Sequence, residues 1–422
     1  MKILVLDSGG RGHALAWKLV QEGHNVTVAP GNAGIALTIP TATLDLRNIS
    51  GIHDYVRTNR IEYVVVGPEA PLAAGIVDHF RIMGIAVFGP TKDAAQIETS
   101  KIYCQRLLEA AGVSVPHASI HQSFNEMWAV AERTEPPFVI KYAGLASGKG
   151  VEVVLTSNDR AIAHERLKLL PYGQFLIQRF ERGPEVSYFV LADEKDYLAI
   201  GSAADYKPLF EGGPNTGGMG GYAPHDMLTP ELQRDINRKI VEPTILALQR
   251  DGCPYTGVLY FQLMLTKYGP VVIEINCRFG DPETQLLMPL LDCELLPLLQ
   301  ATSNSTDSLW KQKVALKNRK TVGIVLTAHG YPGDSVRKGD VIEGLQYAAQ
   351  DALIFHAGTG SKEGKLVTAG GRIITCVGEA ENYTLAYEAA ASAASLIRFE
   401  GAFWREDIAR RVRSSTSITA DL

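Results

Sequence analysis

The sequence has little cysteine, and its few cysteines form no pairing pattern. Five cysteines are spread over 422 residues, and no two of them form a CxxC motif. The odd number and the wide spacing argue against a disulfide framework. Scattered thiols of this kind are typical of a reducing compartment, so we expect a cytoplasmic protein.

Long apolar runs and an excess of one charge are also missing. No run is long enough to span a bilayer, and the apolar start, MKILVL, is too short for a signal peptide. The formal net charge is −5, from 41 basic and 46 acidic residues, which argues against nucleic acid or a membrane surface as a partner. The length predicts about two to four globular domains.

The segment richest in chemical groups is VVIEINCRFGDPETQ, from Val271 to Gln285. It begins as a β-branched strand, on which Glu274 and Asn276 alternate with apolar residues and therefore share one face. A carboxylate beside an amide oxygen suits a hard cation such as Mg²⁺, which takes oxygen ligands and commonly bridges phosphates. Arg278 is able to hold a phosphate through two parallel hydrogen bonds, and Asp281 and Glu283 add two more carboxylates. The alternative is a strand end with solvated charges.

A second segment, GGPNTGGMGG at residues 212–221, contains six glycines in ten residues. Glycine at this density is expected where the main chain lies against a ligand, often with N–H groups facing an anion. A flexible linker is the alternative. Met219, and Tyr222 and Pro224 just beyond, argue against a plain linker.

The motifs GPNTGGMG and IEINCRFGDPETQ resemble those of glycinamide ribonucleotide synthetase, or phosphoribosylamine–glycine ligase, a family of the ATP-grasp superfamily. The resemblance covers nearly the whole chain. It implies an α/β fold with three parts: an N-terminal open parallel α/β domain (1–99), an ATP-grasp domain (100–311, lid subdomain about 116–187) and a β-rich C-terminal domain (312–422). It also implies ATP with Mg²⁺ or Mn²⁺ as cofactors, glycine and 5-phosphoribosylamine as small-molecule partners, and a monomer.

Four short apolar runs predict the strands of the N-terminal sheet, at Lys2–Leu6, His24–Ala29, Glu62–Val66 and Ile85–Phe88. A helix is predicted over Ala14–Gln21. The glycine loop before it matches a dinucleotide fingerprint only in part, so NAD binding is not expected. In the resembling family the loops after these strands face phosphoribosylamine, which implies substrate contacts at Gly9 and Gly10 and places Glu69 on the sugar amine. A solvated loop carboxylate is the alternative for Glu69.

Further strands are predicted at Pro137–Lys141, Val151–Leu155, Gln174–Phe180 and Val186–Leu191, after a helix over Thr91–Ala111. The glycine loop 144–150 lies between two of these strands and resembles the ATP-grasp lid, a flap able to close over phosphates. It is not a Walker loop, because Gly150 stands where that motif needs serine or threonine. The nucleotide-binding residues that the resemblance implies are Lys101, Lys141, Gly148, Lys149, Gln178 and Glu185.

The strands Thr256–Leu265 and Val271–Asn276 are predicted to form a hairpin through the turn 267–269, which brings Glu274 and Asn276 into the site. A long amphipathic helix is predicted over Pro230–Arg250. After the polar stretch Thr302–Gln312, the C-terminal part is predicted to form one helix, over Glu381–Arg398. Its predicted strands are Thr321–Ala328, Ile354–Ala357, Val367–Thr368 and Arg372–Val377.

The chemistry implied by the resemblance is phosphorylation of glycine by ATP, followed by attack of the phosphoribosylamine nitrogen on the acyl phosphate. Such transfer depends on positioning and charge neutralisation. The metal ligands would be Glu274 and Asn276, and the catalytic residues Arg278, Asp281 and Lys141. The implied substrate-binding residues are Gly9, Gly10, Glu69, Lys207, Gly217, Gly218, Met219, Gly220, Arg278 and Asp281.

Several positions near the implied site depart from the family pattern. Glycine replaces a glutamate at position 12, alanine replaces an aspartate of the lid at 143, and Phe261-Gln262 replaces a pair of small residues. Tyr206 and Pro208 replace a histidine and an arginine, and Gln178-Arg179 replaces two glutamates. An inward arginine would lie unpaired near the ribose, so we expect Arg179 to point outward and leave Glu185 alone on the ribose.

Three functional readings follow from these departures. In the first, they are drift with local compensation in a synthetase of this family. In the second, the chain is a paralogue that ligates a different amine or acid. In the third, it is an inactive scaffold of the same fold, against which the intact Glu274, Asn276, Arg278 and Lys141 argue.

Overall fold

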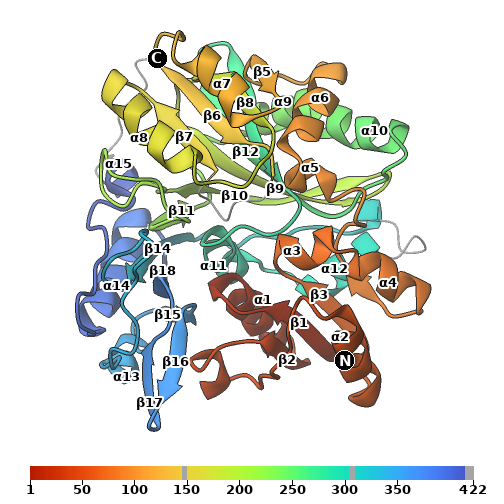
Figure 1. The fold of residues 1–422 in the computed structure, drawn as a ribbon. Helices are drawn as coiled ribbons and strands as arrows, with labels where there is room; N and C mark the ends of the chain where they lie inside the picture. Colours follow the sequence, from red (N-terminus) through yellow and green to blue (C-terminus); the bar gives the residue numbers. More distant parts are fainter. Residues whose placement is uncertain (145–149, 304–308, 414–422) are drawn as a thin grey trace.

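A computed structural model describes residues 1–144, 150–303 and 309–413. In Figure 1 the N-terminal part (red) and the C-terminal part (blue) lie side by side, and a small sheet (orange to yellow) lies at the opposite end of the molecule. A long antiparallel sheet connects these parts. This mixed α/β arrangement agrees with the predicted fold class.

The N-terminal sheet is open and parallel, as predicted, with the order β2-β1-β3-β4. Its strands are β1 (Lys2–Asp7), β2 (Asn25–Pro30), β3 (Tyr63–Val66) and β4 (Val87–Phe88). Its helices are α1 (Gly10–Gln21), α2 (Ile49–Thr58), α3 (Glu69–Ala73) and α4 (Ile76–Ile82). Helix α1 begins at Gly10 rather than at Ala14, because the carboxylate of Asp7 accepts from the N–H groups of Ser8 and Gly9 and turns the chain directly into the helix.

Both faces of β1 are buried. Leu4 and Leu6 pack into one hydrophobic cluster, and Ile3 and Val5 pack into another on the opposite face. A parallel strand covered on both faces is expected to be continuously apolar, as this one is. The carboxyl end of β1, at Asp7, therefore lies inside the molecule.

The small sheet is antiparallel with the order β5-β8-β6-β7. It consists of β5 (Ala118–His121), β6 (Phe138–Tyr142), β7 (Val151–Val154) and β8 (Phe175–Arg179), with α7 (Phe124–Ala131) and α8 (Ser157–Leu167) packed on it. The predicted strands are found within a few residues of their expected bounds. The predicted lid residues 145–149, including Gly148 and Lys149, lie outside the described residues.

The long sheet has eight antiparallel strands in the order β13-β12-β9-β10-β11-β14-β18-β15. Its strands are β9 (Glu185–Asp193), β10 (Tyr197–Asp205), β11 (Gly220–Ala223), β12 (Thr256–Thr266), β13 (Gly269–Asn276), β14 (Lys320–Thr327), β15 (Leu353–His356) and β18 (Arg372–Ala380). The predicted hairpin is β12–β13. Strand β11 was not predicted; it comes from the glycine-rich segment and pairs with β10 on one side and β14 on the other.

Two predicted helices are interrupted. The helix expected over Thr91–Ala111 is α5 (Gln96–Thr99) and α6 (Lys101–Ala110), because Ser100 is extended and its side chain caps α6 by accepting from the N–H of Tyr103. The helix expected over Pro230–Arg250 changes into a π-helical turn at Asn237–Val241, between α9 (Pro230–Ile236) and α10 (Glu242–Arg250). Pro243 has no N–H for the regular ladder, which accounts for the wider turn.

The remaining elements cover the long sheet and the C-terminal part. They are α11 (Glu283–Leu287), α12 (Leu295–Ser303), α13 (Leu345–Ala348), α14 (Tyr383–Leu396), α15 (Arg410–Arg413), β16 (Thr359–Lys362) and β17 (Lys365–Thr368). The sequence predicted α14 and β17 but not β16. In the described ranges, none of the helices has the length and apolar character needed to cross a membrane.

Candidate active site

A large open pocket lies between the small sheet and the β9–β13 end of the long sheet. It collects most of the predicted site residues that the structure describes, although these come from widely separated segments. Those that line it are Glu69, Lys101, Lys141, Gln178, Glu185, Lys207, Gly217, Glu274, Asn276, Arg278 and Asp281.

The predicted metal strand, β13, carries a bulge at the site. Gln262 pairs with Glu274 and Leu263 pairs with Val272, so Ile273 has no partner in the register. Its carbonyl instead accepts a hydrogen bond from Nζ of Lys141 at 2.7 Å. The bulge therefore ties the lysine of the small sheet to the strand of the predicted metal ligands.

Electrostatics keep Glu274 ionised. Burial raises the pKa of its carboxyl, but the charges of Lys101, Lys141 and Lys207 outweigh burial and bring the pKa below its ordinary value. Burial lowers the pKa of Lys141 to about 8, against the opposing charge of Glu274. Three cations thus surround one carboxylate, an arrangement suited to a polyanionic ligand.

Arg278 connects the metal strand to two carboxylates. Its Nη2 donates to Oδ1 of Asn276 at 3.0 Å, and its Nε lies 3.3 Å from Oε2 of Glu69. Nη2 also lies 3.2 Å from Oε1 of Glu98. The arginine thereby orients the amide oxygen of Asn276 and joins the N-terminal loop to the pocket.

Glu98 was missed by sequence reasoning. It is buried, accepts from the N–H of Cys277 at 2.8 Å, and has a pKa raised by burial in spite of the Arg278 charge. No signal in the sequence distinguishes it from a solvated glutamate on an amphipathic helix, because its partners are far away in the chain.

Arg179 of the hinge, predicted to point outward, lines the pocket together with Glu181. The Arg179 side chain is 65% exposed and pairs with Glu181 at 2.7 Å. Its neighbour Gln178 is buried and donates from Nε2 to Oε1 of Gln105 at 2.8 Å. Glu185 accepts from Nε2 of Gln262 at 3.0 Å and faces Lys207 at 3.5 Å.

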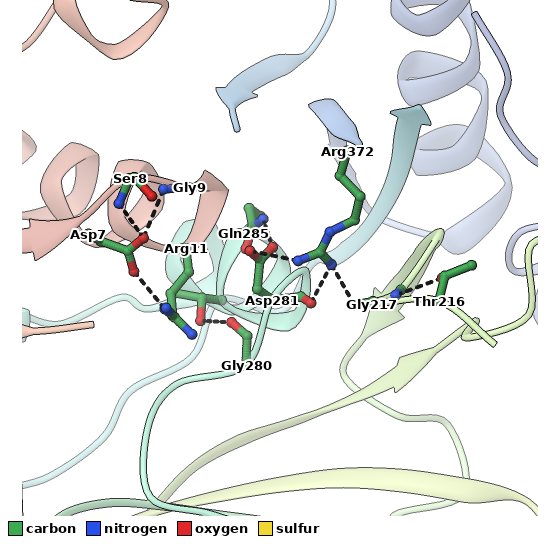
Figure 2. A network of polar contacts seen from close by, with 12 residues as sticks. Asp7, Ser8, Gly9, Arg11, Thr216, Gly217, Gly280, Asp281, Gln285 and Arg372 are labelled. Atoms are coloured by element: carbon green, nitrogen blue, oxygen red, sulfur yellow. Dashed lines mark hydrogen bonds and ion pairs between the residues drawn. The ribbon is translucent and has the colours of Figure 1, made fainter. Parts of the chain in front are cut away.

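Three parts of the chain meet at Asp281. Gln285 donates to Asp281 Oδ1 at 2.6 Å, and Nη2 of Arg372 lies 3.0 Å from Oδ2. Arg372 also donates from Nη1 to the carbonyl oxygens of Asp281 and Gly217, as Figure 2 shows. A Cβ on Gly10 would lie 2.4 Å from Gln285 Nε2, so a side chain at position 10 would require the Gln285 amide to shift. Arg372, which lies in the segment AGGRI at residues 369–373, was missed as a site residue.

Part of the glycine-rich segment lines the pocket, and part of it packs inside the protein. Gly217 lines the pocket and its N–H donates to the hydroxyl of Tyr331 at 2.9 Å. Gly218 has φ +112 and packs against Pro282, where a Cβ would lie 2.5 Å from Cδ. Met219 is fully buried, and a Cβ on Gly220 would lie 2.3 Å from the carbonyl oxygen of Gly323. Met219 and Gly220, which were also predicted as substrate contacts, pack inside the long sheet and are not among the residues that line the pocket.

Two further carboxylates face the pocket: Glu283, a carboxylate of the predicted metal-and-phosphate segment to which no role was assigned, and Asp205. Glu283 Oε1 accepts from the hydroxyl of Tyr260 at 2.6 Å. Among the side chains that the structure describes, Asp205 leaves its buried Oδ1 without a hydrogen-bond partner. Burial, reinforced by Glu283, raises the Asp205 pKa well above its ordinary value. Both residues lie inside or beside the quoted motifs, but periodicity does not reveal that they converge.

The departures at 206 and 208 have a local replacement. Arg405, from the C-terminal part, lies over the ring of Tyr206 at 5.2 Å and donates to the carbonyl oxygen of Pro208 at 2.7 Å. Ala143 packs with Ile102 and Leu176 in a small apolar cluster. Arg405, which also pairs with Asp407, does not line the pocket, so its contacts explain the local packing of these positions.

The donor set fits a phosphate-bridging cation. Glu274 and Asn276 present one carboxylate and one amide oxygen to the pocket. Within residues 1–144, 150–303 and 309–413, no group of three or more His, Cys, Asp or Glu side chains could enclose a metal alone. A cation there needs further oxygen ligands, which is the usual situation of Mg²⁺ bound with nucleotide phosphates.

A small antiparallel sheet above a larger one, with Lys141 of β6 and Lys207 just after β10 lining the pocket between them, defines an ATP-grasp protein. The biotin carboxylase domain of the Hydrogenobacter thermophilus 2-oxoglutarate carboxylase, solved with MgADP, shares this fold; the match has a TM-score of 0.71 and 15% identity, and covers 98% of this chain and 94% of that one. The chain belongs to the phosphoribosylglycinamide synthetase family. Family models for the N domain, the ATP-grasp (A) domain and the C domain match residues 1–98, 99–284 and 321–411.

Relatives match over almost the whole chain. The phosphoribosylamine–glycine ligase of Ralstonia nicotianae is 41% identical over 426 residues, covering 97% of this chain and 99% of its own. The solved phosphoribosylamine–glycine ligase of Thermotoga maritima has a TM-score of 0.81 and 30% identity, covering 97% of this chain and 100% of that one. The predicted family and the predicted ATP-grasp fold are confirmed.

Proposed function

We propose that this protein is a phosphoribosylamine–glycine ligase of purine synthesis. It joins glycine to 5-phosphoribosylamine and converts ATP to ADP and phosphate. The observation that supports this most is the convergence of Glu274, Asn276, Arg278 and Lys141 in one pocket, in a chain that belongs to the family over nearly its full length.

In the proposed reaction, a glycine carboxylate oxygen attacks the γ-phosphorus of ATP, and ADP leaves. The phosphoribosylamine nitrogen then attacks the carbonyl carbon of the glycyl phosphate, and inorganic phosphate leaves as the C–N bond forms. The protein contributes positioning and charge neutralisation rather than a covalent nucleophile. A flap that excludes water protects the acyl phosphate from hydrolysis.

On the nucleotide side, Lys101 and Lys141 neutralise the phosphates, Gln178 meets the adenine and Glu185 binds the ribose. Mg²⁺ or Mn²⁺ held by Glu274 and Asn276 would supply charge neutralisation between the phosphates. The lid positions Gly148 and Lys149 stay predictions, since they lie outside the described residues.

On the substrate side, Glu69 meets the sugar amine, and Arg278 and Asp281 orient the reacting groups. Burial raises the pKa of Glu69, but Arg278 and other charges bring it below its ordinary value, so the carboxylate is ionised and able to accept from an ammonium or amine. The first loop, through Gly9 and Gly10, and the residues Lys207, Gly217 and Gly218 complete the proposed substrate surface.

Measurement of ADP release separates this function from its alternatives. The proposal expects ADP release that requires both glycine and freshly generated 5-phosphoribosylamine. Release only with another amine or acid would identify a paralogue. The absence of release with any such pair would identify an inactive scaffold and overturn the proposal.

Arg179→Glu tests the hinge. Because the Arg179 side chain is largely exposed and its charge is paired with Glu181, the substitution is expected to change the KM for ATP by less than about tenfold. Steady-state kinetics with varied ATP measure this. A hundredfold increase would show that the position acts on the nucleotide directly.

The affinity for ADP without metal is expected to depend on Lys141 and on pH. Burial lowers the Lys141 pKa to about 8 in the free protein, so its charge is present below that pH and is lost above it. ADP affinity, measured calorimetrically with EDTA, should therefore fall by about tenfold between pH 7 and pH 9.5. Lys141→Arg keeps the charge and should flatten this profile. An equally steep profile in Lys141→Arg would assign the titration to another group.

A further inference from the structure

Asp7 fills a hollow that two glycines leave at the end of β1. Its side chain is buried, with the residue 4% exposed. A Cβ built on Gly12 would lie 2.2 Å from Cβ of Asp7, and a Cβ on Gly67 would lie 2.2 Å from Asp7 Oδ2. Asp7 therefore occupies the space where a side chain at position 12 would begin, and the two cannot coexist in this geometry.

Every oxygen of this carboxylate has a partner in the first loop. Oδ1 accepts from the N–H groups of Ser8 and Gly9 at 2.7 and 2.8 Å, and Oδ2 accepts from Nε of Arg11 at 2.7 Å. Arg11 in turn donates from Nη1 to the carbonyl oxygen of Phe279 at 3.3 Å. Figure 2 shows Asp7 and Arg11 beside the cluster around Asp281. Asp7 thus holds the first loop and Arg11 against the segment that carries Arg278 and Asp281.

The charge of Arg11 reaches both carboxylates of the proposed amine site. Burial raises the pKa of Glu69, whereas Arg278 and, more weakly, Arg11 lower it. Burial also raises the pKa of Asp281, whereas Arg372 and then Arg11 lower it. A displacement of Arg11 would therefore change the charge balance at both carboxylates.

We propose that Asp7 is a positioning residue for the phosphoribosylamine site. Its carboxylate, at the end of β1, takes the place of the carboxylate that position 12 of helix α1 lacks. This inference rests on the proposed function. In the resembling family position 12 is a glutamate. A glutamate there would place its Cβ in the volume that the Asp7 side chain occupies, next to the same Arg11. The carboxylate is therefore carried by residue 7 instead of residue 12, and a negative charge next to Arg11 is retained.

The experiment compares Asp7→Asn, Asp7→Gly, Gly12→Glu and the double variant Asp7→Gly/Gly12→Glu in the ADP-release assay. Asp7→Asn keeps the shape but loses the charge, so the KM for phosphoribosylamine should rise about tenfold or more, as expected for loss of a charge-assisted hydrogen bond. The KM for ATP should change by less than about twofold, because the nucleotide contacts are elsewhere.

The double variant provides the decisive comparison. Asp7→Gly alone should impair phosphoribosylamine use, and Gly12→Glu alone should lower the melting temperature because its side chain collides with Asp7. Together they should restore the KM for phosphoribosylamine to within about threefold of the unmodified protein, the non-additivity expected of two groups that share one space. Asp45→Asn is the matched control, since Asp45 pairs with Arg47 on the exposed surface of the same domain.

Two results would overturn the inference while leaving the proposed function intact: an unchanged KM for phosphoribosylamine in Asp7→Asn, or a double variant no better than Asp7→Gly. An unmodified protein that releases no ADP with glycine and phosphoribosylamine would instead refute the proposed function. Melting temperatures, measured for all variants, distinguish unfolding from a specific loss, and the double variant keeps the test valid if a single variant does not fold.

Discussion

Glu274→Gln is expected to lower kcat by at least about 100-fold, the effect typical of removing one electrostatic group from a transition state. The carboxylate is the only charged oxygen donor on the β13 face that holds Asn276, and three lysines keep it ionised. Glutamine preserves the shape but not the charge, so cation affinity and phosphate alignment should both suffer. Steady-state turnover at saturating ATP, with Mg²⁺ or Mn²⁺ varied, measures the effect.

Glu379→Gln is a suitable control for this loss. Glu379 lies on β18 of the same long sheet and pairs with Lys317 and Arg319, away from the pocket. Its substitution should leave kcat within about twofold, because Glu379 does not line the pocket. Turnover like that of the unmodified protein in Glu274→Gln would refute the assignment of β13 as the metal strand.

Arg278→Met is expected to abolish measurable ligation and to destabilise the fold by about 3 to 5 kcal/mol. The guanidinium bridges Glu69 and the buried Glu98, and its removal leaves Glu98 without its cationic partner. Adding Glu98→Gln should recover part of the stability but none of the activity. Urea unfolding monitored by fluorescence measures the first effect, and ADP release measures the second.

Arg234→Met controls for the loss of an ordinary arginine. Arg234 pairs with Glu231 on the surface of α9, with both side chains well exposed. Its removal should cost less than about 1 kcal/mol. A similarly small cost for Arg278→Met, or equal stability of Arg278→Met with and without Glu98→Gln, would contradict the role given to the buried ion pair.

Sequence reasoning succeeded where a local pattern determines which way a side chain faces. Alternation along β13 places Glu274 and Asn276 on one face, and the short turn at 267–269 determines which strand pairs with β13. In each case the deciding interaction lies within a few residues of the side chain concerned.

It failed where the deciding partner is distant in the chain. Glu98 lines the pocket and pairs with Arg278, and Arg372 acts on the site through its ion pair with Asp281. Gly220 was predicted as a substrate contact, yet a Cβ there would lie 2.3 Å from the carbonyl oxygen of Gly323, so its small size serves the close approach of β11 and β14. Glycine content alone does not distinguish a backbone that meets a ligand from a backbone that meets another strand.

Strand β11 also has a consequence for the order in which the protein forms during synthesis. Its partner on one side is β10, but on the other side Gly221 pairs with Gly323 of β14, which the ribosome completes much later. Until then β11 presents an unpaired edge, the kind of surface that promotes aggregation. The pocket loop before β11 therefore reaches its final shape only after translation of the C-terminal part, and a shortened chain ending before β14 would be prone to self-association.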